Sequence, residues 1–381
     1  MDTLTPRERV RKTLNHEEPD RIPIDTGGWL SGICYIAYEN LKKKLGVTTE
    51  TTLLNPITGV ANIDETILKQ LHIDTRYIYP KDAKNYDPKW RDDNSFADEW
   101  GIRWRKPQSS YYYDVAEYPL RDAGMDTLKN YQWPDPKAEG RTDGLVEKAQ
   151  TLFNQGYAIF TVVPGPFEFC TYLRCSENLF VDTVTNVSFF DALLDKVTEI
   201  LIELNNCFLD VVGPYIDNIM YYSDLGDQRG PLINPRFWRE HVKSREIEYV
   251  KAIKRKTKAK VSFHTCGTFW EFREDVLQMG IDVMNPIQTT AADMEPVRLK
   301  KYFGKRMSYW GGVDGQRILP FGSPEEVRNE TRRMICALGP GGGYIFGSCH
   351  NIQNDVPPEN ILALFNEAYE FGTYPLVKCG K

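Results

Sequence analysis

The stretch KVSFHTCGTF, residues 260–269, joins a short apolar run to polar residues and a glycine. Its residues 261–263 are of the β-branched, small and aromatic kinds found in buried strands, and a segment of helical length follows. Residues i and i+2 of a strand point to the same face, so His264 and Cys266 are expected to face one point together. The stretch therefore predicts a strand whose polar end carries two candidate metal ligands.

Strands and helices alternate outward from this stretch. Strand-like runs recur at 22–25, 75–79, 157–163, 218–222, 260–263, 282–285, 307–310 and 344–346. Amphipathic segments of helical length lie between most of them, as at 235–256, 324–338 and 358–371. This alternation indicates βαβ units and a parallel sheet, and eight strands predict an α/β fold of the (β/α)8 TIM-barrel type. A doubly wound open sheet is the alternative.

The N-terminal region departs from this regular pattern. Thr5-Pro6-Arg7-Glu8 predicts a helix start, with Thr5 as N-cap and proline in the first turn, and the resulting helical extension should run to about Asn15. A second helix is expected over 34–45. Residues 50–140 read as an irregular insertion of hairpins and loops, rich in tryptophan and tyrosine. No linker divides the chain, so residues 1–381 are expected to form one domain.

Composition narrows the class of partner. The 381 residues carry a formal net charge of −6, which argues against nucleic acid or an anionic membrane surface as the main partner. No apolar run approaches the roughly 20 residues that span a bilayer, and the charged N-terminus lacks a signal-peptide core, so a cytoplasmic protein is expected. Eight scattered cysteines do not resemble a disulfide framework; most are expected to be core thiols and a few to be ligands.

A third soft ligand comes from another strand end. Cys349 follows the strand-like run 344–346, about eighty residues beyond His264 and Cys266. One imidazole and two thiolates suit Zn²⁺, and three protein ligands leave one coordination position open, as in catalytic zinc sites. The competing interpretation is a packed histidine and small core cysteines.

The barrel interpretation places function at the carboxyl ends of the strands. Three acids in such positions are candidate catalytic groups, because close like charges raise one pKa and provide an acid and a base; they are Asp224, Asp227 and Glu168. Five further polar residues are candidate substrate-binding groups: Asn285, Gln288, Asp314, Gln316 and His350. Helix capping and loop structure are the competing explanations for these residues, and His350 could instead orient its loop.

Six segments together resemble a known family. They are RVRKTLNHEEPDRIPID near the start, DLGDQRGPLINPRFW at 224–238, HTCG at 264–267, GIDVMNPIQ at 280–288, YWGGVDGQRILPFGSPEEV at 309–327 and GPGGGYIFGSCHNIQNDVPPENI at 339–361. They resemble the uroporphyrinogen decarboxylase superfamily, and within it the corrinoid-linked, zinc-dependent methyltransferases. The resemblance covers nearly the whole chain apart from the 50–140 region.

The resemblance implies a TIM barrel and places His264, Cys266 and Cys349 on the family's zinc pattern. It also implies methyl transfer between a small methyl ether or thiol and a corrinoid (cobalamin). The chain has no D-x-H-x-x-G corrinoid-binding motif, so the corrinoid is expected on a separate carrier protein.

Two other functions remain open from the sequence. The first is decarboxylation of a tetrapyrrole, but residues 26–30 lack the arginines with which the decarboxylases hold substrate carboxylates, and this disfavours it. The second is a non-catalytic tetrapyrrole- or corrinoid-binding module with a structural zinc ion.

Overall fold

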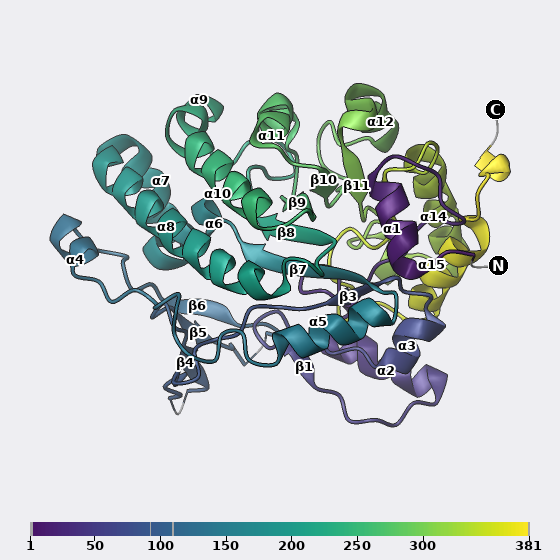
Figure 1. Ribbon diagram of the computed structural model, residues 1–381, viewed down its shortest axis with the longest axis horizontal. Coiled ribbons are helices and arrows are strands. Elements are labelled where there is room, and N and C mark those ends of the chain that lie inside the picture. The colour runs from purple at the N-terminus through teal and green to yellow at the C-terminus, as the bar shows by residue number, and fades with distance from the viewer. Residues whose placement is uncertain (1–2, 92, 109, 380–381) are drawn as a thin grey trace.

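A curled parallel sheet forms the centre of the molecule (Figure 1). The computed structural model describes residues 3–91, 93–108 and 110–379. Seven strands pair in the order β12-β11-β10-β9-β8-β7-β3, each parallel to its neighbours. Their bounds are β3 Thr75–Tyr77, β7 Ala158–Pro164, β8 Asn218–Tyr222, β9 Lys260–His264, β10 Val283–Asn285, β11 Ser308–Trp310 and β12 Tyr344–Ile345.

The eighth strand position is reduced to a single residue. Ile24 forms a parallel bridge with Phe346, and its carbonyl accepts a hydrogen bond from the Asp74 backbone N–H at 2.9 Å. Ile24 therefore lies between β12 and β3, where it joins the two edges of the sheet. The predicted strand at 22–25 is this short because Pro23 has no N–H to donate to a ladder. The prediction of a TIM-barrel-like α/β fold is confirmed, and the open doubly wound sheet is wrong.

Helices surround the sheet (Figure 1). The extension α1 starts from a Thr5–Glu8 capping box, and α14 starts from one formed by Ser323 and Glu326. Their bounds are α1 Pro6–Leu14, α2 Tyr35–Leu45, α5 Leu145–Asn154, α6 Pro166–Arg174, α7 Ser176–Thr185, α8 Val187–Val212, α9 Pro235–Phe237, α10 Lys243–Lys256, α11 Arg273–Met279, α12 Pro296–Phe303, α13 Ile318–Phe321, α14 Pro324–Leu338 and α15 Pro358–Phe371. The predicted helix at 235–256 is divided by a π-helical turn, Trp238–Val242.

The predicted irregular insertion contains short elements of its own. They are β1 Leu53–Asn55, β2 Val60–Ala61, α3 Glu65–Gln70, β4 Ser95–Ala97, β5 Arg103–Arg105, β6 Asp114–Glu117 and α4 Met125–Lys129. Strands β4, β5 and β6 form an antiparallel sheet at the end of the molecule opposite the chain termini (Figure 1). Trp100 packs on Phe169 of α6 at 4.4 Å between ring centroids, and Trp104 packs on Tyr172 at 5.7 Å. The insertion thus covers one side of α6.

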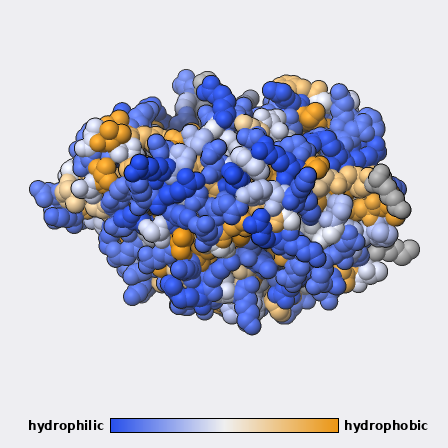
Figure 2. All heavy atoms as spheres, turned by 90° about the horizontal axis from the view of Figure 1, so that it is seen from above, coloured by the Kyte–Doolittle hydropathy of each residue, from blue (hydrophilic) through white to orange (hydrophobic). Residues whose placement is uncertain are grey.

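The surface is largely hydrophilic on the face shown in Figure 2, with hydrophobic side chains in small scattered groups. Among the described residues, none of the helices has the length and apolar character needed to cross a bilayer. Cys336 of α14 and Cys379 form a disulfide, a pairing that the sequence did not indicate. Six cysteines remain as free thiols, and Cys266 and Cys349 are among them.

Candidate metal site and adjoining cavities

His264, at the end of β9, is held with one ring nitrogen free. Its Nδ1 lies 2.6 Å from Oδ1 of Asn285, and the Asn285 amide nitrogen donates to the carbonyl of Trp310 at 3.2 Å. This arrangement places the imidazole proton on Nδ1 and leaves the Nε2 lone pair available. Nε2 lies 3.5 Å from Sγ of Cys266. Tetrahedral zinc with ordinary Zn–N and Zn–S bonds separates such atoms by about 3.5 Å, so this pair fits the ion.

The turn that carries Cys266 is fixed by backbone contacts. The Cys266 N–H donates to Oδ1 of Asp224 at 2.7 Å, and the Gly267 N–H donates to Oε1 of Gln288 at 2.7 Å. Gly267 has a φ of +72°, and a Cβ there would lie 2.3 Å from the carbonyl oxygen of Asp227. Only glycine fits this position, which explains why it follows the cysteine directly.

A third potential ligand atom comes from His350. The ligand atoms of His264, Cys266 and His350 all lie within 4.8 Å of one another. Sequence reasoning expected His350 to point away, because neighbours on an extended strand face opposite sides. The chain instead bends at Cys349 and His350, just after the bridge between Val313 and Ser348.

The ring of His350 is oriented by its own backbone. Its Nδ1 accepts a hydrogen bond from the Asn351 N–H at 2.8 Å, which places the ring proton on Nε2. In this arrangement Nε2–H is a donor. Cys349 is not a member of the group of three, but its thiol and that of Cys266 line the same cavity. The predicted zinc ligand Cys349 therefore stays a prediction.

Burial keeps the imidazoles of His264 and His350 and the thiols of Cys266 and Cys349 neutral in the absence of a cation. It lowers the pKa of His264 and of His350 to about 4, so both imidazoles are neutral near neutral pH, and the lone pair on Nε2 of His264 is available to a metal ion. Burial, reinforced by Asp224, raises the pKa of the Cys266 thiol. Burial also raises the pKa of Cys349 to about 12. A divalent cation is the kind of partner that would stabilise the thiolates here.

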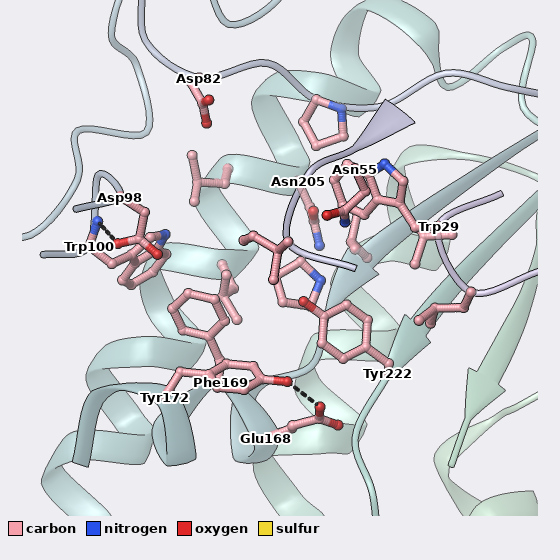
Figure 3. A pocket seen from close by; sticks show the side chains of 18 of the residues that line it. Trp29, Asn55, Asp82, Asp98, Trp100, Glu168, Phe169, Tyr172, Asn205 and Tyr222 are labelled. Atoms are coloured by element: carbon pink, nitrogen blue, oxygen red, sulfur yellow. Dashed lines mark hydrogen bonds between the residues drawn. The ribbon is translucent and has the colours of Figure 1, made fainter. Parts of the chain in front are cut away.

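One cavity of about 500 Å³ opens onto this group. Figure 3 shows part of its lining. His264, Cys266 and His350 line one part of it. Aromatic side chains from the barrel, α6 and the insertion form much of the remaining wall: Trp29, Trp100, Trp104, Phe169, Tyr172 and Tyr222. Sequence reasoning noted the tryptophans of the insertion but could not assign them to a site.

Glu168 and Asp224 form an acidic pair beside the metal-ligand group. Oε1 of Glu168 accepts from the Tyr172 hydroxyl at 2.8 Å (Figure 3). Its Oε2 accepts from the Asp224 N–H at 2.9 Å. Burial, followed by the charge of Asp224, raises the pKa of Glu168 to about 8. Burial also raises the pKa of Asp224. Tyr172, one helical turn after Glu168, was missed, although the i, i+4 spacing could have suggested it.

The other predicted acid has a different setting. Asp227 is half-buried, and its Oδ1 accepts from the backbone N–H groups of Arg229 and Gly230 at 2.6 and 2.9 Å. These bonds hold its loop, and backbone donors lower the pKa of its carboxyl. The pair at the metal-ligand group is thus Glu168 and Asp224, whereas the sequence suggested Asp224 and Asp227.

A second cavity, of about 440 Å³, adjoins the same group. Gln288, Asp314 and Gln316 line it, together with Asp227, Cys349 and His350. Asn285 lies behind His264 and supports its ring. Cys266 and His350 line both cavities, so the candidate metal site stands between a largely aromatic cavity and a polar one.

Two curated proteins are similar in sequence to this chain. A methylated-thiol–coenzyme M methyltransferase of Methanosarcina mazei is 25% identical over 267 residues, which cover 69% of this chain and 65% of that protein. A uroporphyrinogen decarboxylase of Ruthia magnifica is 25% identical over 190 residues, 49% of this chain and 50% of that protein. The match therefore spans less than two thirds of either relative.

A solved methyltransferase structure from Methanosarcina mazei shares the fold, with a TM-score of 0.66 at 17% identity over 97% of this chain and 99% of that one. The profile of the uroporphyrinogen decarboxylase (URO-D) family matches residues 114–371. That range includes His264, Cys266, Cys349 and His350, together with the acidic pair. This chain belongs to the uroporphyrinogen decarboxylase (URO-D) family.

Proposed function

We propose that this protein is a zinc-dependent methyltransferase that moves a methyl group between a small methyl ether or thiol and a corrinoid held by a carrier protein. The observation that carries the proposal is the pairing of Nε2 of His264 with Sγ of Cys266 at 3.5 Å, at the meeting point of two cavities. The similarity to a methyltransferase that acts on methylated thiols supports it. A zinc ion held there would act as a Lewis acid on the heteroatom that carries the methyl group.

The proposed ligands are His264, Cys266 and Cys349. His350 then keeps the proton on Nε2 that its Nδ1 bond to Asn351 implies, and this N–H faces the substrate. The alternative third ligand is His350 itself, which the distance of 4.8 Å or less within the group favours. Either choice leaves a coordination position for substrate, because three protein ligands do not complete a tetrahedron.

The acidic pair supports an ether as the methyl donor. Breaking a methyl–oxygen bond produces an alkoxide or phenolate that needs a proton, whereas a thiol that accepts a methyl group releases one. Glu168 holds a proton near neutral pH because its pKa is raised to about 8. It can give this proton to the departing oxygen while Asp224 holds the Cys266 backbone in place.

The lining of the cavities argues against a tetrapyrrole decarboxylase. Lys81 and Arg141 are the cationic side chains among the described residues that line the two cavities. The first cavity also contains five acidic side chains, those of Asp82, Asp98, Glu99, Glu168 and Asp224, of which Glu168 holds a proton near neutral pH. A porphyrinogen with eight carboxylates would meet repulsion here. A non-catalytic module with structural zinc would need Cys349 and His350 together as ligands beside His264 and Cys266, and the proton that the Asn351 bond leaves on Nε2 of His350 opposes this.

Methyl transfer from methyl ethers and methyl thioethers to reduced cobalamin tests the proposal. We expect transfer that stops on chelation and returns with zinc. Comparing Cys349→Ala with His350→Ala then identifies the third ligand: the ligand variant loses metal and activity, and the other keeps the metal. Transfer that survives thorough chelation would contradict a zinc-dependent mechanism.

A further inference from the structure

The first cavity is acidic away from the metal-ligand group. Asp82, Asp98 and Glu99 all line it, and Figure 3 shows Asp82 on the loop above the cavity with its carboxylate directed inward. Asp98 is fully engaged by the insertion: it accepts from the N–H groups of Trp100 and Ile102 at 2.9 Å each, and from the Trp104 indole at 2.9 Å. Asp98 therefore holds the Trp100–Trp104 segment of the cavity wall in place.

Asp82 differs from these neighbours. Among the described residues, no hydrogen bond or ion pair ends on its carboxylate, whereas Glu99 is paired with Arg141. Asp82 lines the cavity but is also exposed to solvent. Partial desolvation raises the pKa of its carboxyl and the charge of Glu99 raises it further, while Arg141 acts in the opposite direction. Asp82 thus presents an acceptor to the cavity that its own fold does not use.

Both cations in the cavity wall, Arg141 and Lys81, have hydrogen-bond partners within the fold. The Arg141 guanidinium is shared between the Glu99 carboxylate and the carbonyl of Asp135, which accepts at 2.9 Å. Lys81 donates to the carbonyl of Asp143 at 2.5 Å. An anionic ligand would meet more acidic side chains than cations in this cavity, and of the two cations among the described lining residues only Lys81 keeps spare N–H donors.

The aromatic walls in the middle of the cavity favour a planar ligand. Trp29 stacks on Tyr79 with ring centroids 4.2 Å apart, and Trp100 and Trp104 pack on α6 from the other side. Aromatic walls of this kind contact planar apolar groups over a large area and also attract cations through their ring faces. They suit an aromatic substrate with a neutral or positive end.

We propose that Asp82 recognises the end of the substrate remote from the methyl group, by accepting a hydrogen bond from a hydroxyl or an ammonium group. The substrate class is then an aromatic methyl ether or thioether with a neutral or cationic donor head, and anionic heads are rejected. This inference rests on the proposed function for the identity of the reacting end. What it adds is the recognition of the substrate end that lies away from the reacting methyl group.

Three probes of similar shape test the assignment: 4-methoxybenzylamine, 4-methoxybenzyl alcohol and 4-methoxybenzoate. Binding to the full-length protein is measured by calorimetry and by quenching of tryptophan fluorescence, since three tryptophans line the cavity. We expect the amine and the alcohol to bind more tightly than the benzoate. Asp82→Asn should weaken the amine about tenfold or more, because it removes a charged acceptor. Asp82→Lys should reverse the preference in favour of the benzoate.

Asp87→Asn is the matched control, because Asp87 is exposed, lines a different surface pocket and is absent from the first cavity. It should leave all three affinities unchanged. Circular dichroism confirms that each variant is folded. The inference is overturned if the benzoate binds as tightly as the amine, if Asp82→Asn changes the amine affinity by less than twofold, or if none of the probes binds at millimolar concentration.

Methyl transfer from the same probes to reduced cobalamin separates the two proposals. Asp82-dependent binding without any transfer would support the recognition role and count against the methyltransferase function. Transfer whose substrate preference is the same in wild type and in Asp82→Asn would keep the function and overturn the recognition role.

Discussion

Replacing Glu168 by glutamine removes a buried proton-binding group while keeping a side chain of the same shape. Glu168 has its pKa raised from the ordinary 4.5 to about 8, first by burial and then by the charge of Asp224. Between these two pH values the folded state binds a proton that the unfolded state releases. Stability of the wild type must therefore fall as the pH rises through this window, and level off above pH 8.

The size of the effect follows from the shift. Within this window, each pH unit lowers the free energy of unfolding by about 1.4 kcal/mol. Raising the pH from 6 to 9 should therefore destabilise the wild type by roughly 2 to 3 kcal/mol relative to Glu168→Gln. Urea unfolding of both proteins at pH 6, 7, 8 and 9 measures this difference. Titrating groups remote from Glu168 are common to both proteins and cancel, and Glu168→Gln,Asp224→Asn compared with Asp224→Asn corrects for the coupling to Asp224. A stability difference that stays constant from pH 6 to pH 9 would refute the raised pKa, and with it the role of Glu168 as a proton donor.

Two further substitutions test the supports of the site. Asn285→Ala removes the side-chain oxygen that orients the His264 ring, and we expect zinc affinity to fall roughly tenfold to a hundredfold with little change in fold. A competition titration measures the zinc affinity. An unchanged affinity would show that the ring needs no such support. Arg141→Ala removes the ion-pair partner of Glu99, and the two side chains of this ion pair are only 10% and 11% exposed. We therefore expect the free energy of unfolding, measured in urea, to fall by about 3 kcal/mol. A fall of less than about 1 kcal/mol would contradict this expectation.

The regular part of the barrel could be predicted from the sequence because its signals are local. The strand at 218–222 and the helices at 324–338 and 358–371 have the predicted bounds. In the strand, burial on both faces produces a continuous apolar run. In the helix that starts at Pro324, Ser323 and Glu326 form a capping box that marks its first turn.

The features that sequence reasoning missed depend on contacts between distant parts of the chain. The aromatic wall of the first cavity forms because Trp100 and Trp104 of the insertion pack on α6, and nothing local to either tryptophan indicates α6 as the partner. The bend that brings His350 toward His264 follows from the end of pairing between β12 and its neighbours. Periodicity along the chain does not contain that information.

The candidate site was only partly predictable for the same reason. His264 and Cys266 share a face because of their spacing on one strand, and the structure has them 3.5 Å apart. The partner of Asp224 could not be inferred by spacing, because Glu168 lies on another element 56 residues away.

Zinc content of the purified protein tests the central claim most directly. The account predicts close to one equivalent of zinc per chain, lost in Cys266→Ser and in His264→Gln and retained in a surface control such as Asp87→Asn. Less than half an equivalent in wild type, or a content that these two substitutions leave unchanged, would contradict it.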